Sequence, residues 1–255
     1  MPQLMHMASR AVASVLFPDT CLACRTHVAE RGTLCPDCWS QLHFIAEPVC
    51  DVTGTPFQHE FGERMVSAEA LADPPPYRRA RAAVIHSGIA RQLVQRLKYG
   101  DQTELAPWMA RWMLRAGSNL VAESDVIVAV PLHKRRFLAR RYNQSAELGR
   151  AIAHETGLAF EPGALRRVKP TRQQVGLSAN ERKLNVRGAF SVPPEREIAV
   201  AGRTVLLVDD VYTTGATIIA ATRALKRAGA AEVNVLTFSR VVAHFSGPLH
   251  HRTFG

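Results

Sequence analysis

The sequence contains no apolar run approaching the roughly 20 residues that a membrane-spanning helix needs, which excludes a membrane span. It also lacks a recognisable export signal, because Arg10 interrupts the apolar stretch 5–17 and no small-residue cleavage site follows it. We therefore expect a cytoplasmic protein that begins with a short amphipathic helix ending at Pro18. Neither apolar nor charged residues are scarce, at 47% and 21% of the chain, so wholesale disorder and fibrous repeats are excluded as well.

Acidic residues are outnumbered: 22 Asp and Glu stand against 32 Lys and Arg, which gives a net charge of +10. The excess lies in two segments, 131–150 and 163–187, which carry net charges of +5 and +6, whereas the remainder nets −1. Polyanions are the natural partners of such a chain. Because the excess is local, it favours a site for a compact anion over non-specific coating of nucleic acid. Two solvated basic faces are the alternative.

No cysteine follows residue 50, and all five lie in the N-terminal segment. Two Cys-x-x-Cys pairs ten residues apart allow two tight knuckles to bring four thiolates into the tetrahedral set that Zn²⁺ favours. The predicted ligands of a structural zinc are Cys21, Cys24, Cys35 and Cys38. The same ligand type also suits iron, whereas a disulfide framework belongs to exported proteins. Cys50 is either half of a decayed pair, with Thr53 in the partner's place, or an ordinary buried residue, and we favour the second.

We expect four segments along the chain. Residues 1–50 form the N-terminal helix and zinc-binding module. Residues 51–79, which include the run Pro74–Pro76 and show little apolar periodicity, form a linker. Residues 80–243 form the main domain, and residues 244–255 form a tail.

The main domain alternates continuous apolar runs with helical periodicity. The runs 125–131, 205–211 and 233–239 predict strands that are covered on both faces. The segments 142–156 and 216–228 predict helices between them. This alternation indicates an α/β fold with a parallel sheet and flanking helices. In such sheets the ligand site lies outside the carboxyl ends of the strands.

The segment VLLVDDVYTTGAT, residues 205–217, combines a buried strand with the chemistry of a sugar-phosphate site. Asp209 and Asp210 stand at the strand's carboxyl end, where their carboxylates can accept hydrogen bonds from vicinal hydroxyls of a ligand in an open site. The turn 213–215 then leads into a helix start, whose unpaired N–H groups and positive dipole suit a phosphate. A phosphate beside a diol describes a ribose 5-phosphate. No Lys follows Gly215, so the Walker pattern of nucleoside triphosphate hydrolases is absent.

This segment resembles the phosphoribosyl pyrophosphate motif of type I phosphoribosyltransferases. The whole chain resembles the competence protein F (ComF) family, in which a four-cysteine zinc module precedes a domain with the type I phosphoribosyltransferase-like parallel sheet. The resemblance extends to LKYGD at 97–101, VAVPLHKRR at 128–136, RRYNQ at 140–144 and RQQVGLSANERKLNVRGAF at 172–190. Arg141 departs from the family pattern, which usually has Gly at that place.

The resemblance implies a role for each matching residue. In type I enzymes the paired acids bind the ribose 2′ and 3′ hydroxyls, and the loop after them binds the 5-phosphate. A loop after an earlier strand holds pyrophosphate, and in the amidophosphoribosyltransferases a mobile basic loop closes over the site. The corresponding substrate-binding residues here are Asp209 and Asp210; Thr213, Thr214, Gly215, Ala216 and Thr217; Pro131, Leu132, His133 and Lys134; and Arg172 and Arg182. The resemblance assigns no catalytic residue.

The implied function is the binding of phosphoribosyl pyrophosphate, or a related sugar phosphate, together with Mg²⁺. Either a phosphoribosyltransferase or a relic that keeps only donor binding would do this. The family's association with competence implies an alternative from another class: a non-catalytic, zinc-containing adaptor in the uptake or processing of single-stranded DNA, with a DNA-uptake helicase as a partner. In that case the basic segments would follow the phosphates of the strand.

Overall fold

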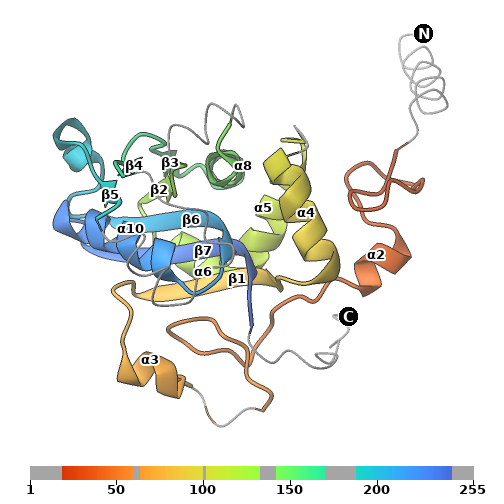
Figure 1. Ribbon diagram of the computed structural model, residues 1–255, viewed down its shortest axis with the longest axis horizontal. Helices are drawn as coiled ribbons and strands as arrows, with labels where there is room; N and C mark the ends of the chain where they lie inside the picture. The colour runs from red at the N-terminus through yellow and green to blue at the C-terminus, as the bar shows by residue number, and fades with distance from the viewer. Residues whose placement is uncertain are drawn as a thin grey trace.

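A computed structural model describes residues 19–59, 62, 64–99, 102–132, 142–169 and 188–242 (Figure 1). Its centre is a five-stranded sheet in the order β1-β7-β6-β2-β3, in which every neighbouring pair is parallel. The strands are β1 (Arg79–Ile85), β2 (Val126–Ala129), β3 (Ala159–Phe160), β6 (Thr204–Tyr212) and β7 (Glu232–Arg240). The predicted parallel α/β sheet is confirmed, and the three predicted strands correspond to β2, β6 and β7.

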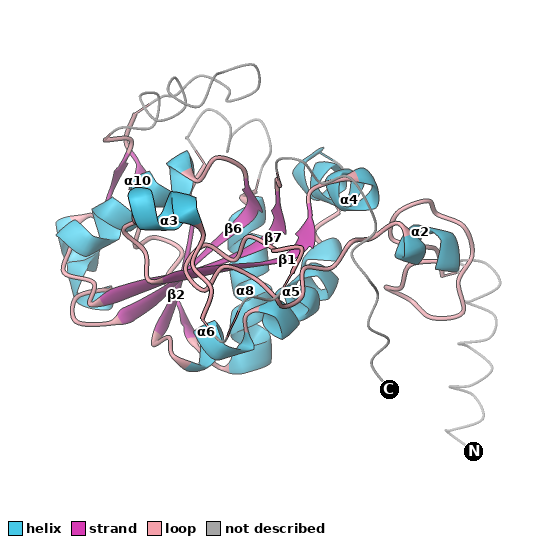
Figure 2. Ribbon diagram, turned by 90° about the horizontal axis from the view of Figure 1, so that it is seen from below, coloured by secondary structure: helices cyan, strands magenta, loops and turns pink. Residues whose placement is uncertain are grey.

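Helices cover both faces of the sheet, which is why its central strands are apolar throughout. Figure 2 shows α10 on one side of the sheet and α5, α6 and α8 on the other. Each face has its own core. Along β6, Leu206 packs on the face covered by α5, α6 and α8, and Leu207 packs on the face covered by α10, because successive side chains of a strand point to opposite faces. The helices are α4 (Gly88–Tyr99), α5 (Leu105–Ala116), α6 (Ser118–Ala122), α8 (Gln144–Thr156) and α10 (Ala216–Arg227).

Several short elements lie outside the sheet. They are α2 (Pro36–Ser40), α3 (Ala68–Ala72), the antiparallel pair β4 (Arg166–Arg167) and β5 (Phe190–Ser191), and the 3-10 helix η1 (Pro194–Ala199). In the described part of the chain, no helix combines the length and the apolar character that a bilayer crossing demands. The helix predicted over 5–17 and the tail predicted over 244–255 lie outside the described residues.

The order in which strands are added to the sheet changes direction between β2 and β6, although the two strands are parallel. From β2 the chain passes through α8 to β3, at one edge, whereas from β6 it passes through α10 to β7, on the opposite side. Neighbouring strands whose connections diverge in this way leave a crevice at their carboxyl ends, which is where open parallel sheets bind ligands. The topology therefore predicts a binding site between the ends of β2 and β6.

The N-terminal module docks on α4. The side chain of Gln92 donates a hydrogen bond to the carbonyl of Ala23 at 3.1 Å, and Arg96 donates one to the carbonyl of Leu22 at 2.9 Å. Leu34 of the module lies in the same apolar core as Leu93. Polar bonds and shared apolar packing together fix the module against the main domain.

The segment predicted as a linker runs beside β1. The backbone N–H of Ala80 donates to the carbonyl of Val52 at 2.8 Å, and the buried Arg81 donates to the carbonyl of Asp51 at 2.9 Å. Tyr77, just before β1, is also buried. This part of the segment is fixed by the sheet, whereas the domain borders at residues 50 and 79 stay predictions.

Candidate functional site

Asp209 and Asp210 lie in β6 beyond the point where β2 stops. The last β2 residue, Ala129, pairs with Val208, and the backbone N–H of Val130 donates to the carbonyl of Val208 at 2.9 Å. On its other side, β6 continues to pair with β7 up to Tyr212. The two aspartates therefore stand beside the carboxyl end of β2, near the carboxyl end of β6, as the sequence predicted.

Both carboxylates are held by side chains of the same chain. One oxygen of Asp209, Oδ1, accepts hydrogen bonds from the Ser145 hydroxyl at 2.8 Å and from the backbone N–H of Asp210 at 2.9 Å. The Oδ2 oxygen of Asp210 lies 2.7 Å from the Nζ atom of Lys98 and accepts a bond from the Gln144 amide at 3.4 Å. Three elements, α4, α8 and β6, thus meet at these two residues.

The expectation that the two carboxylates stand in an open site is wrong in this structure. Asp209 and Asp210 are only 8% and 6% exposed, because the first turn of α8 and the last turn of α4 cover them. A buried carboxylate is costly unless it is hydrogen-bonded or paired. The partners named above supply what water would otherwise provide.

Burial changes the acidity of Asp209. Desolvation and the neighbouring charge of Asp210 raise the pKa of Asp209 to about 7, although the hydrogen bond from Ser145 opposes the rise. Asp209 changes its charge near neutral pH.

The predicted phosphate loop follows β6 directly. Thr213 and Thr214 are exposed, and Gly215 is the N-cap of α10 with a φ of +75°. Ala216 is buried and Thr217 is half-buried at the helix start. Within the described part of the chain, no side chain caps α10, and the first turn of the helix has no acidic residue. An N-terminus of this kind keeps its positive dipole available to an anion.

A buried aromatic pair supports this loop from below. A Cβ atom at Gly215 would lie 2.4 Å from the Oη atom of Tyr212, so only glycine fits. The Tyr212 hydroxyl shares a hydrogen bond of 2.9 Å with that of Tyr77, and the Arg240 guanidinium lies 4.2 Å from the centre of the Tyr212 ring. Arg240 also donates to the Thr55 hydroxyl at 2.7 Å. The position of the loop thus depends on contacts with Tyr77 and Arg240, which are distant in the sequence and which no local sequence pattern predicts.

The other predicted ligand-binding residues are placed only in part. Pro131 and Leu132 follow β2 at the same edge of the sheet and are half-buried. His133, Lys134, Arg172 and Arg182 lie outside the described residues, so their roles stay predictions.

Sequence reasoning assigned no role to three residues that the structure brings to the aspartates. They are Lys98, Gln144 and Ser145. A signal was present, because Lys98 belongs to LKYGD and Gln144 to RRYNQ, two of the segments that carry the resemblance. Tyr142 of the second segment also donates a hydrogen bond of 2.5 Å to the carbonyl of Leu97 in the first. The two segments are therefore in contact with each other as well as with the aspartates.

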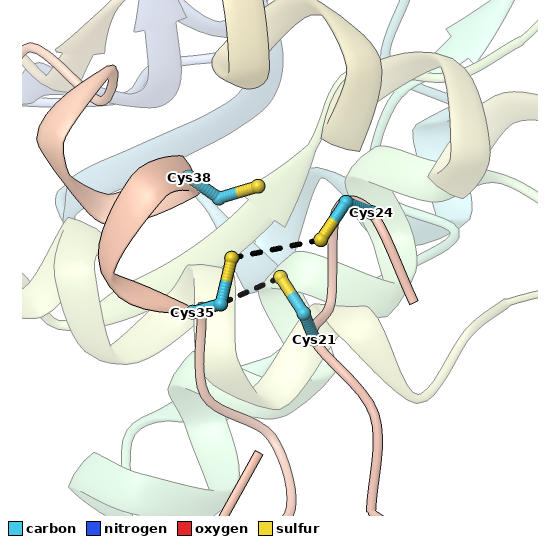
Figure 3. Close-up of side chains that lie close together, drawn as sticks. All are labelled: Cys21, Cys24, Cys35 and Cys38. Carbon is cyan, nitrogen blue, oxygen red and sulfur yellow. Dashed lines mark hydrogen bonds between the residues drawn. The ribbon is translucent and has the colours of Figure 1, made fainter. Parts of the chain in front are cut away.

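The four predicted zinc ligands converge (Figure 3). Their sulfur atoms all lie within 4.8 Å of one another, with Cys24 and Cys35 in contact at 3.5 Å. Zinc–sulfur bonds of about 2.3 Å put tetrahedral ligands roughly 3.8 Å apart, so the cluster fits the ion. The backbone N–H groups of Ala23 and Cys35 donate to the Cys21 sulfur at 3.4 and 3.2 Å, which stabilises a thiolate. Hydrogen bonds with Thr26 lower the pKa of Cys24 to about 6.

Cys50 stands apart from this cluster in a turn of its own. Its sulfur accepts hydrogen bonds from the backbone N–H groups of Thr53 at 3.4 Å and Ser67 at 3.3 Å. Burial raises the pKa of the Cys50 thiol, but these bonds and those of the Thr53 and Ser67 side chains outweigh it and lower the pKa to about 7. Cys50 is fully buried, as expected, in surroundings that favour its thiolate more than ordinary burial would.

Two sequence families match the chain. The double zinc ribbon domain matches residues 12–70, and the phosphoribosyl transferase domain matches residues 158–247. The first match agrees with the four-cysteine cluster, and together they support a structural zinc ion.

Named relatives cover most of the chain. DNA utilization protein YhgH of Salmonella typhimurium is 33% identical, over 87% of this chain and 90% of its own length. The protein of that name from Escherichia coli K12 is 31% identical, over 88% of this chain and 98% of its own. Competence protein F of Haemophilus influenzae is 28% identical with the same two coverages.

Solved structures give a weaker likeness. An allosteric regulatory enzyme of purine biosynthesis is 22% identical, with a TM-score of 0.39, over 56% of this chain and 29% of its own. A glutamine phosphoribosylpyrophosphate amidotransferase from B. subtilis is 25% identical, with a TM-score of 0.35, over 55% and 30%.

Loss of one zinc ligand should release the metal. For Cys38→Ser we expect less than about a tenth of the zinc per chain that the wild type holds, and a loss of unfolding free energy on the order of 4 kcal/mol. Metal content by mass spectrometry and urea unfolding measure both effects. Cys50→Ser is the matched control and should keep one zinc per chain. A Cys38→Ser protein with full zinc, or a wild type that holds iron instead, would contradict the assignment.

The raised pKa of Asp209 predicts a pH dependence of stability. The folded pKa of about 7 exceeds the unfolded value of about 3.9, so the folded state holds the extra proton between these values. Stability from this group is present below about pH 4 and falls by up to about 1.4 kcal/mol per pH unit as the pH rises towards 7. Asp209→Asn should remove that slope in urea unfolding.

The quantity to compare is the difference in unfolding free energy between variant and wild type at each pH. His86, whose pKa burial lowers, is present in both proteins, so its contribution largely cancels in that difference. Asp125→Asn, at an exposed position, is the control for the same substitution elsewhere in the chain. A difference for Asp209→Asn that does not change with pH would refute the raised pKa.

Glycine at position 215 is required twice, for its backbone conformation and for its lack of a Cβ. Gly202 has a similar φ of +70°, but a Cβ there would meet nothing within 4 Å. We expect Gly202→Ala to cost about 1–2 kcal/mol for the left-handed conformation alone, and Gly215→Ala to cost clearly more in the same urea titration. Tyr212→Phe should recover part of that excess in the double variant. Equal costs at the two glycines would mean that the loop has room for a side chain.

Proposed function

Since the chain belongs to the family of DNA utilization protein YhgH and competence protein F, we propose that its phosphoribosyltransferase-like domain binds phosphoribosyl pyrophosphate or a related ribose 5-phosphate. One observation carries the proposal. Two carboxylates near the end of β6 are followed directly by the uncapped N-terminus of α10, at the place in the sheet where the strand order changes direction. The carboxylates suit a diol and the helix N-terminus suits a phosphate. The ligand that has both groups on one small ring is a ribose 5-phosphate.

The division of labour within the site follows from these chemistries. The 5-phosphate would accept hydrogen bonds from the loop at 213–217, where Gly215 permits close approach of the backbone. The 2′ and 3′ hydroxyls would donate to Asp209 and Asp210, once a ligand takes over part of the bonding that α8 and α4 now provide. Pyrophosphate would extend towards Pro131 and Leu132, and from there towards the basic segment that follows β2.

Mg²⁺ accompanies this donor in the proposal. Among the described residues, the only cluster of three or more metal-ligating side chains is that of the four cysteines. The described chain therefore has no carboxylate cage for magnesium, and the phosphates of the donor together with water would hold most of the ion, as is usual for Mg²⁺. When bound, the ion would neutralise charge on the pyrophosphate. The chain's own part is to bind the sugar phosphate and to exclude water from it.

A second candidate is a role on single-stranded DNA, which the names of the relatives favour. The basic segments 131–150 and 163–187 would then follow the phosphates of the strand. The zinc module would contact a protein partner, such as a helicase of DNA uptake. Aromatic residues beside these segments are sparse, chiefly Phe137 and Tyr142, which argues against a base-stacking platform.

Donor affinity tests the main proposal. In calorimetry with phosphoribosyl pyrophosphate and Mg²⁺, the double variant Asp209→Asn/Asp210→Asn should bind at least about tenfold more weakly than the wild type. A change of charge alone cannot explain such a loss, because removing two negative charges favours a polyanion. Asp125→Asn serves as the exposed control.

A competition experiment separates the two candidate functions. Competition between the donor and single-stranded DNA, at several salt concentrations, would place both in one cleft. Binding of DNA with a steep salt dependence and without any binding of donor would support the adaptor instead. Absence of donor binding to the wild type would remove the main proposal.

A further inference from the structure

Lys98 is a charged group at the twin aspartates that has no assigned part in binding. It is the next-to-last residue of α4, and its Nζ atom lies 2.7 Å from Oδ2 of Asp210. The side chain of Lys98 is 23% exposed and that of Asp210 is 8% exposed, so the pair is largely shielded from solvent. Within the described ranges, no other Lys or Arg lies at ion-pair distance from either aspartate.

The position of this ammonium is fixed by the whole of α4. Leu93 and Leu97 of the helix are fully buried, and Gln92 and Arg96 hold two carbonyls of the first zinc knuckle. Lys98 follows Arg96 by two residues. Its charge is therefore placed by helix packing, whereas a lysine on a loose surface turn would sample many positions.

Gln144 completes the arrangement around Asp210. It is 3% exposed, its amide nitrogen donates to Asp210, and its buried Oε1 atom has no hydrogen-bond partner among the described residues. Exchanging the amide oxygen and nitrogen would set two acceptors against each other at Asp210, so the orientation is determined. A buried acceptor without a donor is rare and costly. A ligand hydroxyl is the kind of group that would satisfy it.

The positive charge of Lys98 offsets an electrostatic problem in a site of this kind. Two adjacent carboxylates repel any phosphorylated ligand, and the repulsion is stronger in a dry crevice than in water. The ligand proposed above carries both phosphates and a diol, so the site must accept hydrogen bonds and tolerate negative charge at once. A fixed cation against one carboxylate reconciles the two requirements, because it neutralises a charge and leaves oxygen lone pairs free.

We propose that Lys98 is a positioning residue for the ligand: its ammonium is the built-in counter-charge that allows Asp209 and Asp210 to accept the hydroxyls of a polyanionic sugar phosphate. This inference rests on the proposed function. It predicts that Lys98 acts through Asp210 and that its charge, more than its shape, is what matters. Lys98 and Gln144 would then give the segments LKYGD and RRYNQ a shared role, which is to prepare Asp210 for the ligand.

A double-mutant cycle on donor affinity tests the inference. With phosphoribosyl pyrophosphate and Mg²⁺ in calorimetry, Lys98→Met should bind at least about tenfold more weakly than the wild type. In the Asp210→Asn background the same change should cost less than about threefold. Lys98→Arg, which keeps the charge, should stay within about threefold of the wild type.

Two controls separate this role from a structural one. Arg91→Met removes the same charge from an exposed position of the same helix and should leave affinity unchanged. Lys98→Met strands a buried carboxylate and can unfold the protein, whereas Lys98→Met/Asp210→Asn removes both charges and should stay folded by circular dichroism. If Lys98→Met does not fold, the comparison of Asp210→Asn with the double variant still measures the cost of losing Lys98 without its partner, and Lys98→Arg tests whether a charge at this position is enough. A cost above about threefold in either comparison would then overturn the inference.

The outcomes distinguish this inference from the function on which it rests. If the wild type binds the donor and Lys98→Met binds it equally well or more tightly, the lysine is a bystander or a competitor, and only the inference is overturned. Equal losses for Lys98→Arg and Lys98→Met would also overturn it, because charge would then not be the cause. A wild type that binds no donor overturns the proposed function and the inference together.

Discussion

Two adjacent carboxylates are buried at the carboxyl edge of the sheet, and much of the surrounding structure serves to stabilise them there. A buried carboxylate without partners costs several kcal/mol. Asp209 is stabilised by Ser145 from α8, and Asp210 by Lys98 from α4. The positions of both helices are therefore coupled to β6, and a shift of either one would leave a charge unpaired.

Helix α4 connects this pair with the zinc module. Within seven residues it contacts the first knuckle through Gln92 and Arg96, the apolar core through Leu93, and Asp210 through Lys98. An α-helix holds such residues in a fixed relation, because its backbone bonds leave little freedom between them. The module thus contributes to the placement of a cation in the candidate site, even though its four sulfur atoms belong to another part of the fold.

Periodicity and spacing were enough to predict a parallel α/β sheet and three of its strands, β2, β6 and β7. The run 205–211 became β6 at Thr204–Tyr212, and the segment 142–156 became α8, which begins two residues later because Asn143 caps it. The four zinc ligands also followed from spacing alone, since each Cys-x-x-Cys knuckle is a local structure. The solvent exposure of the two aspartates could not be predicted, because the residues that cover them lie 64 and more positions away in the chain.

By itself the sequence determined which residues would stand at the end of β6 and what chemistry they offer: acceptors at Asp209 and Asp210, then a turn that leads into a helix start. These features are local, so the order of residues decides them. Only the tertiary structure decided that Lys98 and Gln144 reach Asp210, and that Tyr212 and Arg240 support the turn. Such contacts join segments distant in sequence, and they arise when helices and strands pack into one core, where burial forces each polar group to find a partner.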